Sequence, residues 1–200
     1  MGQTRRLSQS IALALLHLGS WKLRLDYPPT PSYVLVGAPH TTNWDFYYFL
    51  LVKFATGLNF KWIGKDSLFR GPMGWAMQRL GGIPVDRKAS HNYVAQIVER
   101  LKQDGPQILT IAPEGTRKKA SYWKTGFYYI ALGAGLPISL GFLNYKTKEL
   151  GIGPYFYPSG DLQADFVFIQ EFYSDKAGMR PERQGKVQLR TDVPEDELRS

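Results

Sequence analysis

The feature that most constrains the fold is the alternation of short apolar runs with segments whose apolar residues recur at helical spacing. The short runs predict buried strands at residues 33–38, 60–63, 83–85, 107–112 and 137–145, with an edge strand at 155–157. The helical spacing predicts helices at residues 7–18, 43–56, 72–80, between Ser90 and Gly105, and at 124–132 and 162–173. Strands that alternate with helices along a chain predict an α/β fold, with a mainly parallel or mixed sheet flanked by helices.

The 200 residues fit a single domain with a short region on either side. Prolines at positions 28, 29 and 31 separate an N-terminal region, residues 1–27, from the main domain, residues 28–173. Residues 174–200 are polar and contain prolines, which predicts a loose C-terminal tail.

The N-terminal region is expected to form an amphipathic helix at residues 7–18, with Arg5, Arg6, Lys22 and Arg24 around it. Such a helix can pack on the domain, lie on an anionic membrane surface, or do both. The sequence contains no run of about 20 apolar residues, the length that crosses a bilayer. No small-residue cleavage pattern follows the apolar stretch. We therefore expect a cytoplasmic protein that binds the membrane peripherally.

Composition excludes some chemistries and favours anionic partners. The chain has no cysteine, so disulfides, thiolate metal sites and cysteine nucleophiles are excluded. The net charge of +8 favours nucleic acid, anionic lipid or phosphorylated substrates. The basic residues are scattered and form no nucleic-acid recognition motif, so no nucleic-acid partner is expected.

His40 is the most promising of the three histidines. It follows the strand at 33–38 and precedes a helix, at the edge where open α/β sheets bind ligands. Asp45, five residues later, can reach back to orient the imidazole, leaving one nitrogen free to accept a proton. The alternative is a histidine at a helix start beside a surface aspartate. His17 and His91 are expected to be structural or solvated.

A second polar cluster, residues 114–117 (Glu-Gly-Thr-Arg), follows the strand at 107–112. Gly115 permits a tight turn, and Arg117 offers a rigid fork for a phosphate or carboxylate. Lys118 and Lys119 follow it. Taken alone, this cluster is also compatible with an ordinary charged turn.

Together the two clusters resemble the glycerol-phosphate and lysophospholipid acyltransferase family. Residues 40–45 (HTTNWD) match its His-x4-Asp signature, and residues 114–117 match its Glu-Gly-Thr-Arg block. Residues 64–65 and 81–87 resemble the block between them. Residues 123–126 and 136–140 resemble the segments that follow. The blocks occur in the family's order over residues 33–145.

The resemblance implies an acyltransferase that uses no metal and no cofactor beyond its acyl donor, acyl-CoA or acyl carrier protein. His40 would take the proton from the acceptor hydroxyl, and Asp45 would orient His40. N–H groups at the helix start after His40 would stabilise the oxyanion. Glu114 would bind an acceptor hydroxyl or fix Arg117. Arg117, with Arg87, Lys65 or Lys124, would hold the acceptor's phosphate. Gly115 and Thr116 of the same block would also contribute to substrate binding.

The expected acceptor is a lysophospholipid, with 1-acyl-sn-glycerol-3-phosphate preferred, in phospholipid biosynthesis. The sequence departs from the family at Ala112, where the block usually has Phe, and within residues 41–44. A non-glycerol lipid acceptor therefore stays open. So does a hydrolase that uses the same His–Asp pair on a lipid ester or thioester. The intact motifs argue against an inactive lipid-binding relative.

Overall fold

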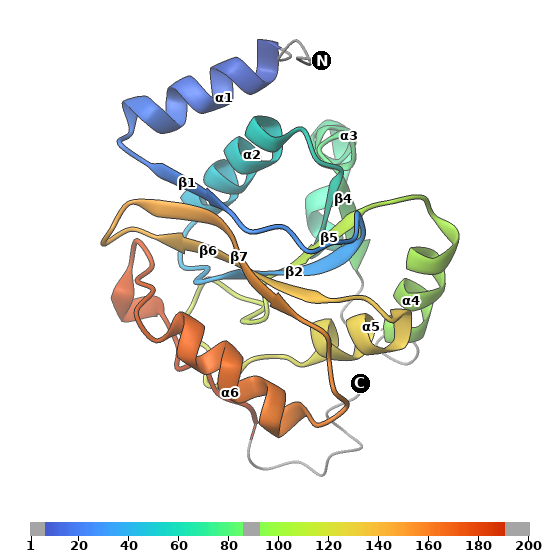
Figure 1. Cartoon of the computed structure of the whole chain (residues 1–200). Coiled ribbons are helices and arrows are strands. Elements are labelled where there is room, and N and C mark those ends of the chain that lie inside the picture. The colour runs from blue at the N-terminus through green and yellow to red at the C-terminus, as the bar shows by residue number, and fades with distance from the viewer. Residues whose placement is uncertain (1–6, 86–92, 191–200) are drawn as a thin grey trace.

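The computed structural model describes residues 7–85 and 93–190, which form an α/β domain around a seven-stranded mixed sheet (Figure 1). The strand order is β1-β7-β6-β2-β5-β3-β4. All neighbouring strands are parallel except β6 and β7, which are antiparallel. The strands are β1 (Lys22–Leu25), β2 (Tyr33–Ala38), β3 (Phe60–Lys65), β4 (Gly82–Val85), β5 (Ile108–Ile111), β6 (Ile138–Asn144) and β7 (Glu149–Phe156). The predicted fold class is confirmed.

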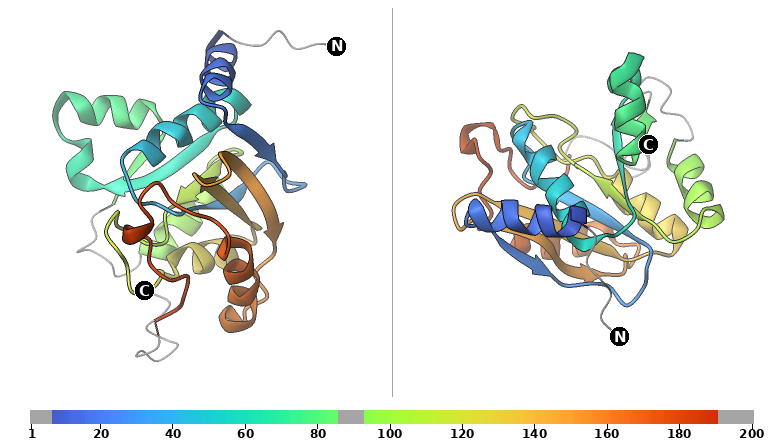
Figure 2. Two further views of the ribbon diagram at one scale, coloured as in Figure 1. Left: turned by 90° about the vertical axis from the view of Figure 1, so that its left-hand side faces the viewer. Right: turned by 90° about the horizontal axis from the view of Figure 1, so that it is seen from above.

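Helices cover both faces of the sheet. They are α1 (Leu7–Leu18), α2 (Trp44–Thr56), α3 (Gly71–Arg79), α4 (Tyr93–Gln103), α5 (Gly126–Ala134) and α6 (Leu162–Tyr173), with short 3-10 helices at Asp66–Phe69 and Pro181–Arg183. Helices α1 and α2 lie against each other on one face, while α4, α5 and α6 cover the other (Figure 2). The predicted cap at Ser90 lies outside the described residues.

Strand β2 shows how the sequence builds a core on each face. Side chains alternate along a strand. Val34 and Val36 therefore join the core under α5 and α6, while Tyr33 and Leu35 join the core under α1 and α2. Burial on both faces explains why this strand is an uninterrupted apolar run. Because β2 is the fourth of the seven strands, its carboxyl end and the loop that follows lie midway across the sheet.

The sequence prediction was wrong at one edge of the sheet. Strand β1 was not expected, yet it pairs in parallel with β7 and forms the edge. Strand β7 is longer than the predicted 155–157 and lies between β1 and β6. Its glycines have low β propensity, which weakens the sequence pattern that predicts a strand. At Gly153 the reason for a glycine is packing, because a Cβ there would meet the Phe172 ring at 2.6 Å.

The predicted loose tail is also wrong for residues 174–190, which pack on the domain. Tyr145 N–H donates to the Ala177 carbonyl at 2.9 Å, and Trp123 N–H donates to the Gln188 carbonyl at 2.9 Å. Leu189 is buried. This polar segment has no apolar periodicity, the pattern from which packing is predicted in a sequence. It is held by backbone hydrogen bonds instead, so its packing was missed. Residues 191–200 lie outside the described part of the chain.

Helix α1 has the predicted bounds, but most of its apolar surface faces outward. Ala12 and Leu16 are buried. Leu7, Ile11, Leu15 and Leu18 lie three or four residues apart and are exposed by 77%, 51%, 40% and 79%. This spacing puts them on one side of the helix. Within the described residues, no helix is long and apolar enough to span a bilayer.

Candidate active site

His40 and Asp45 form a pair at the carboxyl end of β2. His40 lies two residues beyond the strand, and Asp45 lies in the first turn of α2. His40 Nδ1 is 3.3 Å from Asp45 Oδ2, and their side chains are 28% and 6% exposed. A donor at Nδ1 leaves Nε2 as the nitrogen that can accept a proton. The structure therefore brings together the two residues that sequence spacing suggested.

Several donors hold Asp45 as a carboxylate. The N–H groups of Thr41 and Thr42 donate to Oδ2 at 2.6 and 2.7 Å. The hydroxyls of Thr42 and Tyr145 donate to Oδ1 at 3.1 and 3.0 Å. Burial raises the pKa of Asp45, but hydrogen bonds from His40, Thr42 and Thr41 outweigh it, so the pKa lies below its ordinary value. Asp45 is thus ready to orient His40 and to balance its positive charge.

The same contacts limit which N–H groups near the helix start can stabilise the oxyanion. Thr41 and Thr42 N–H bind Asp45, and Trp44 N–H donates to Thr42 Oγ1 at 3.1 Å. His40 N–H donates to Glu114. These four N–H groups near the helix start are already paired inside the protein, so they are not free for a reacting oxygen.

Glu114 points into the protein. Its Oε1 accepts from His40 N–H at 3.0 Å. Its Oε2 is buried without a hydrogen-bond partner among the described residues. Burial raises the pKa of this carboxyl to about 7. Glu114 does not line the pocket described below. Its Oε1 therefore supports the loop that carries His40, while its expected roles toward the acceptor and Arg117 stay predictions.

The rest of the Glu-Gly-Thr-Arg block forms a tight turn. Gly115 has a φ of 62°, and the side chain of Lys124 packs over it. Thr116 Oγ1 accepts from Lys118 N–H at 3.2 Å. The guanidinium of Arg117 donates to Asn43 Oδ1. Arg117 and Glu114 therefore link the block to the His40–Asp45 segment at two points.

A pocket of about 1050 Å³ contains the pair, and both charged and apolar side chains line it. Its polar lining includes His40, Asn43, Asp45, Lys65, Thr116, Arg117, Lys118, Lys124 and Arg183. Its apolar lining includes Phe46, Phe49, Val52 and Trp62 on the α2 side, and Phe127 and Ile130 of α5. Lys65, Gly115, Thr116, Arg117 and Lys124, which the sequence predicts as substrate-binding residues, all line this pocket. Arg87 lies outside the described residues.

Sequence reasoning missed two contributors that come from distant segments. Tyr145, after β6, binds Asp45. Arg183 lines the pocket from the C-terminal segment, and Arg180 N–H in that segment donates to Thr41 Oγ1 at 3.3 Å. Neither residue belongs to a motif, so no local signal marked them. Within the described residues, no three His, Asp or Glu side chains are grouped to hold a metal ion.

Comparison with known proteins identifies the family. The sequence model of the Acyltransferase family matches residues 24–139, more than half of the chain. The chain belongs to this family. It is an acyltransferase, and both the His40–Asp45 pair and the Glu-Gly-Thr-Arg block fall inside the matched region.

A solved structure with a similar fold is the 1-acyl-sn-glycerophosphate (LPA) acyltransferase PlsC from Thermotoga maritima. The TM-score is 0.56 and the sequence identity 16%, over 82% of this acyltransferase and 74% of that chain. At this identity the likeness shows a shared fold. No curated protein matches the chain.

Proposed function

We propose that this acyltransferase moves a fatty acyl group from a thioester to a hydroxyl of a lysophospholipid, preferably 1-acyl-sn-glycerol-3-phosphate, in phospholipid biosynthesis. The observation that carries the proposal is the pocket, because it joins the His40–Asp45 pair to both a cationic and an apolar lining. A phosphorylated lipid has the two matching parts. The similar structure from Thermotoga maritima bears the name of an enzyme for this acceptor.

In the proposed mechanism His40 Nε2 takes the proton from the acceptor hydroxyl while Asp45 stabilises the resulting imidazolium. The acceptor oxygen attacks the thioester carbonyl and forms a tetrahedral intermediate. The C–S bond then breaks, the carbonyl re-forms as an ester, and the leaving thiolate takes the proton from His40. The charges and atoms balance without a covalent enzyme intermediate. Because nearby N–H groups of the helix start are paired internally, we propose that side-chain cations stabilise the oxyanion.

The cations of the pocket are the proposed phosphate site. Arg117 is held against Asn43, two residues before Asp45, so its guanidinium lies beside the reacting pair. Lys65 and Lys124 line the same pocket from β3 and from the segment before α5. Arg183 adds a fourth positive charge. Arg87 stays a prediction from the sequence. The same cations suit both donors, since acyl-CoA carries phosphates and acyl carrier protein is acidic.

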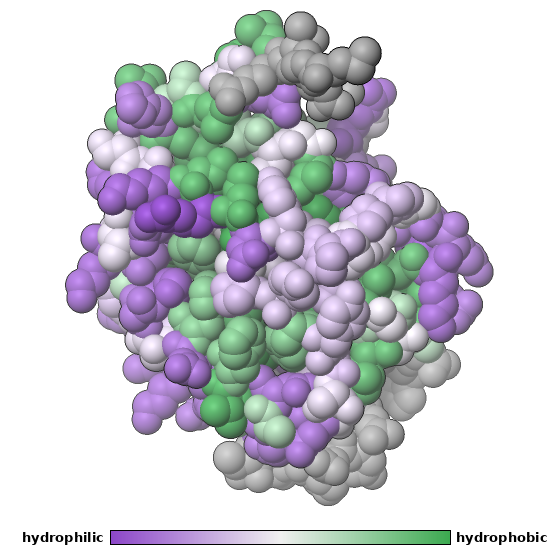
Figure 3. Space-filling model, viewed as in Figure 1, coloured by the Kyte–Doolittle hydropathy of each residue, from purple (hydrophilic) through white to green (hydrophobic). Residues whose placement is uncertain are grey.

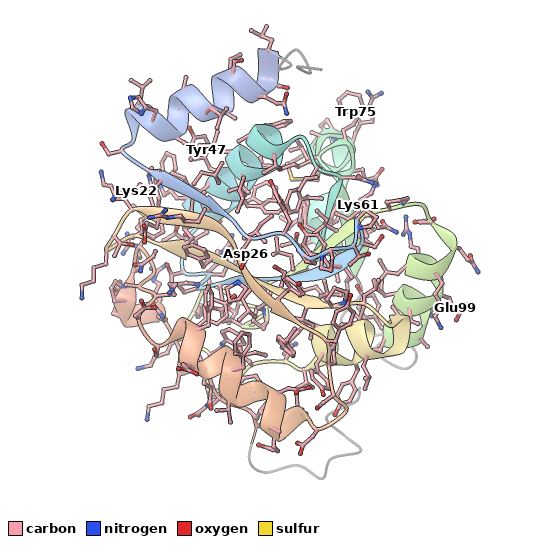
Figure 4. All side chains as sticks on the ribbon, viewed as in Figure 1. Lys22, Asp26, Tyr47, Lys61, Trp75 and Glu99 are labelled. Carbon is pink, nitrogen blue, oxygen red and sulfur yellow. The ribbon has the colours of Figure 1, made fainter. Side chains whose placement is uncertain are left out.

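We also propose that the protein acts peripherally on an anionic, cytoplasmic membrane surface. The support is the exposed apolar side of α1, formed by Leu7, Ile11, Leu15 and Leu18. Hydrophobic side chains gather in the upper part of the molecule, where α1 and α2 lie (Figure 3). On α2 and α3, Tyr47 and Trp75 are also exposed in this part of the molecule (Figure 4). Aromatic side chains of this kind suit a membrane interface.

Of the cations expected around α1, the structure describes Lys22 and Arg24. Arg5 and Arg6 lie outside the described residues. Arg24 pairs with Glu149 at 2.9 Å, while Lys22 is exposed. The exposed apolar side of α1 supports apolar insertion, while the electrostatic contribution of Arg5 and Arg6 stays a prediction from the sequence.

The proposal is tested by a mass-spectrometric screen of acyl transfer. Acyl-CoA and acyl carrier protein loaded with the same chain are each offered with lysophosphatidate, a zwitterionic lysophospholipid, a monoacylglycerol, or no acceptor. We expect the diacyl phosphate product, formed fastest from lysophosphatidate. Free fatty acid as the main product, with or without acceptor, would instead identify a hydrolase.

A further inference from the structure

Tyr145 follows β6 and lies outside the region that matches the family model. Its hydroxyl donates to Asp45 Oδ1 at 3.0 Å, across 100 residues of sequence. The tail holds the Tyr145 backbone, because Tyr145 N–H donates to the Ala177 carbonyl at 2.9 Å. Burial, and then the negative charge of Asp45, raises the pKa of Tyr145 well above its ordinary value, so the phenol keeps the proton that it donates.

The two oxygens of Asp45 have different partners. Oδ2 faces His40 and accepts from the N–H groups of Thr41 and Thr42. Oδ1 accepts from Thr42 and Tyr145. Three of these four contacting residues belong to the loop that carries Asp45 itself. Among the hydrogen bonds of the described residues, Tyr145 supplies the contact that ties this carboxylate to the rest of the sheet.

An aromatic cluster holds the Tyr145 ring in place. The Trp21 ring lies 5.1 Å from it edge-on, and the Tyr48 ring lies 5.8 Å away. Trp21 and Tyr48 are themselves 4.5 Å apart. Trp21 lies between α1 and β1, and its N–H donates to the Leu16 carbonyl at 2.9 Å. The end of α1 is therefore linked through Trp21 to the residue that binds Asp45.

We propose that Tyr145 is a positioning residue for acyl transfer. Its hydroxyl fixes the rotation of the Asp45 carboxylate and reduces the negative charge on it, and Trp21 holds the Tyr145 ring in place. This inference rests on the proposed roles of His40 and Asp45. A hydrogen bond from a phenol draws negative charge from the carboxylate. Without it, Asp45 favours the imidazolium form of His40 more strongly, and its carboxylate is freer to turn away from His40.

The proposal sets the direction of a pH effect. The titratable and charged groups around the pair are Glu114, Tyr48, Tyr145 and the pocket cations Lys65, Arg117, Lys118, Lys124 and Arg183. All except Tyr145 are common to the native protein and to a Tyr145→Phe variant, so they cancel in the comparison. Loss of the Tyr145 hydroxyl should move the acid limb of kcat/KM to higher pH, because the base must be unprotonated to act.

The experiment compares Tyr145→Phe with Tyr33→Phe across a pH series. Tyr33 is a matched control, because its buried hydroxyl has no hydrogen-bond partner among the described residues. For Tyr145→Phe we expect kcat about tenfold lower, both KM values unchanged, and an acid limb about 0.5 pH unit higher. Tyr33→Phe should match the native enzyme in all three. Trp21→Phe should also lower kcat and move the acid limb to higher pH, but by less than Tyr145→Phe does.

Three results would overturn the proposal: a folded Tyr145→Phe protein with native kcat and acid limb, a rise in KM at native kcat, or equal effects from Tyr33→Phe. If Tyr145→Phe does not fold, 3-fluorotyrosine is placed at position 145. Its more acidic phenol strengthens the bond, so the acid limb should move to lower pH, and an unmoved limb overturns the proposal. A His40→Ala variant that stays active defeats the proposed function itself, whatever the Tyr145 variants do.

Discussion

The backbone N–H of His40 donates to Glu114 Oε1 at 3.0 Å. This contact fastens the loop that carries the proposed base to the loop after β5 that carries the proposed phosphate-binding residues. The bond from Arg117 to Asn43 makes a second connection between the same two loops. The two family motifs, 74 residues apart in sequence, therefore form one structural unit.

Glu114→Gln tests whether burial in this unit raises the pKa of the Glu114 carboxyl. Glutamine keeps an oxygen for His40 N–H but removes a buried acid whose pKa is raised from 4.5 to about 7. Between these two pH values the folded state keeps a proton that the unfolded state has released, so the native protein loses stability as pH rises through this window. At about 1.4 kcal/mol per pH unit, the loss reaches up to about 3 kcal/mol.

Urea unfolding at pH 5 and pH 8 measures this effect. The free energy of unfolding of the native protein should fall relative to Glu114→Gln as pH increases from 5 to 8. A Glu114→Ala variant, which leaves His40 N–H without its acceptor, should be less stable than Glu114→Gln by about 1–3 kcal/mol at both pH values. Parallel pH dependences for the native and glutamine proteins would show that Glu114 is ionised in the fold.

Arg117→Ala should mainly weaken binding of a phosphorylated acceptor. A charge-assisted hydrogen bond is worth about 1.5–3 kcal/mol, so we expect the acceptor KM to rise roughly 10- to 100-fold. Arg117→Lys should recover only part of this, because an ammonium lacks the planar fork. Arg100→Ala is the control, since it removes the same charge from the exposed surface of α4. An unchanged acceptor KM in Arg117→Ala would place the phosphate elsewhere.

Replacing Ile11 and Leu15 together by glutamate should release the protein from vesicles. Both side chains are exposed on α1, so the change removes apolar contact with lipid without disturbing the buried Ala12 and Leu16. Co-sedimentation with vesicles is the measurement. The native protein should bind anionic vesicles more strongly than neutral ones, and its binding to anionic vesicles should decline as salt increases.

Val167→Glu provides the control for this experiment, because Val167 is 60% exposed on α6, on the opposite face of the sheet. It should bind vesicles as the native protein does. Native binding by the α1 double variant would exclude α1 as the membrane-contacting element. No binding by the native protein would favour a soluble acceptor.

How much the sequence could predict depends on the range of the interactions involved. Strand β2 was located to the residue because its whole run is buried, and α2 was located by its apolar spacing and by Gly57, which adopts the left-handed conformation at its end. The pairing of His40 with Asp45 could also be predicted, since the two residues are only five positions apart in sequence.

The remaining parts depend on contacts that no local pattern encodes. Strand β1 exists because β7 offers it an edge to pair with. The segment at 174–190 is held by backbone hydrogen bonds to distant residues. Glu114 belongs to a recognised motif, yet the direction of its side chain depends on an N–H that becomes available only when the two loops meet. Tyr145 lies 100 residues from its partner, so its role required the fold.

The most direct test of the account is the rate of acyl transfer to lysophosphatidate by His40→Ala. The His40 side chain is partly exposed, and Asp45 keeps its bonds from Thr41, Thr42 and Tyr145 without it, so the variant should fold with near-native melting temperature. Loss of a general base should lower kcat by about 100-fold or more. A folded His40→Ala protein that transfers acyl groups at near-native rate would contradict the central claim.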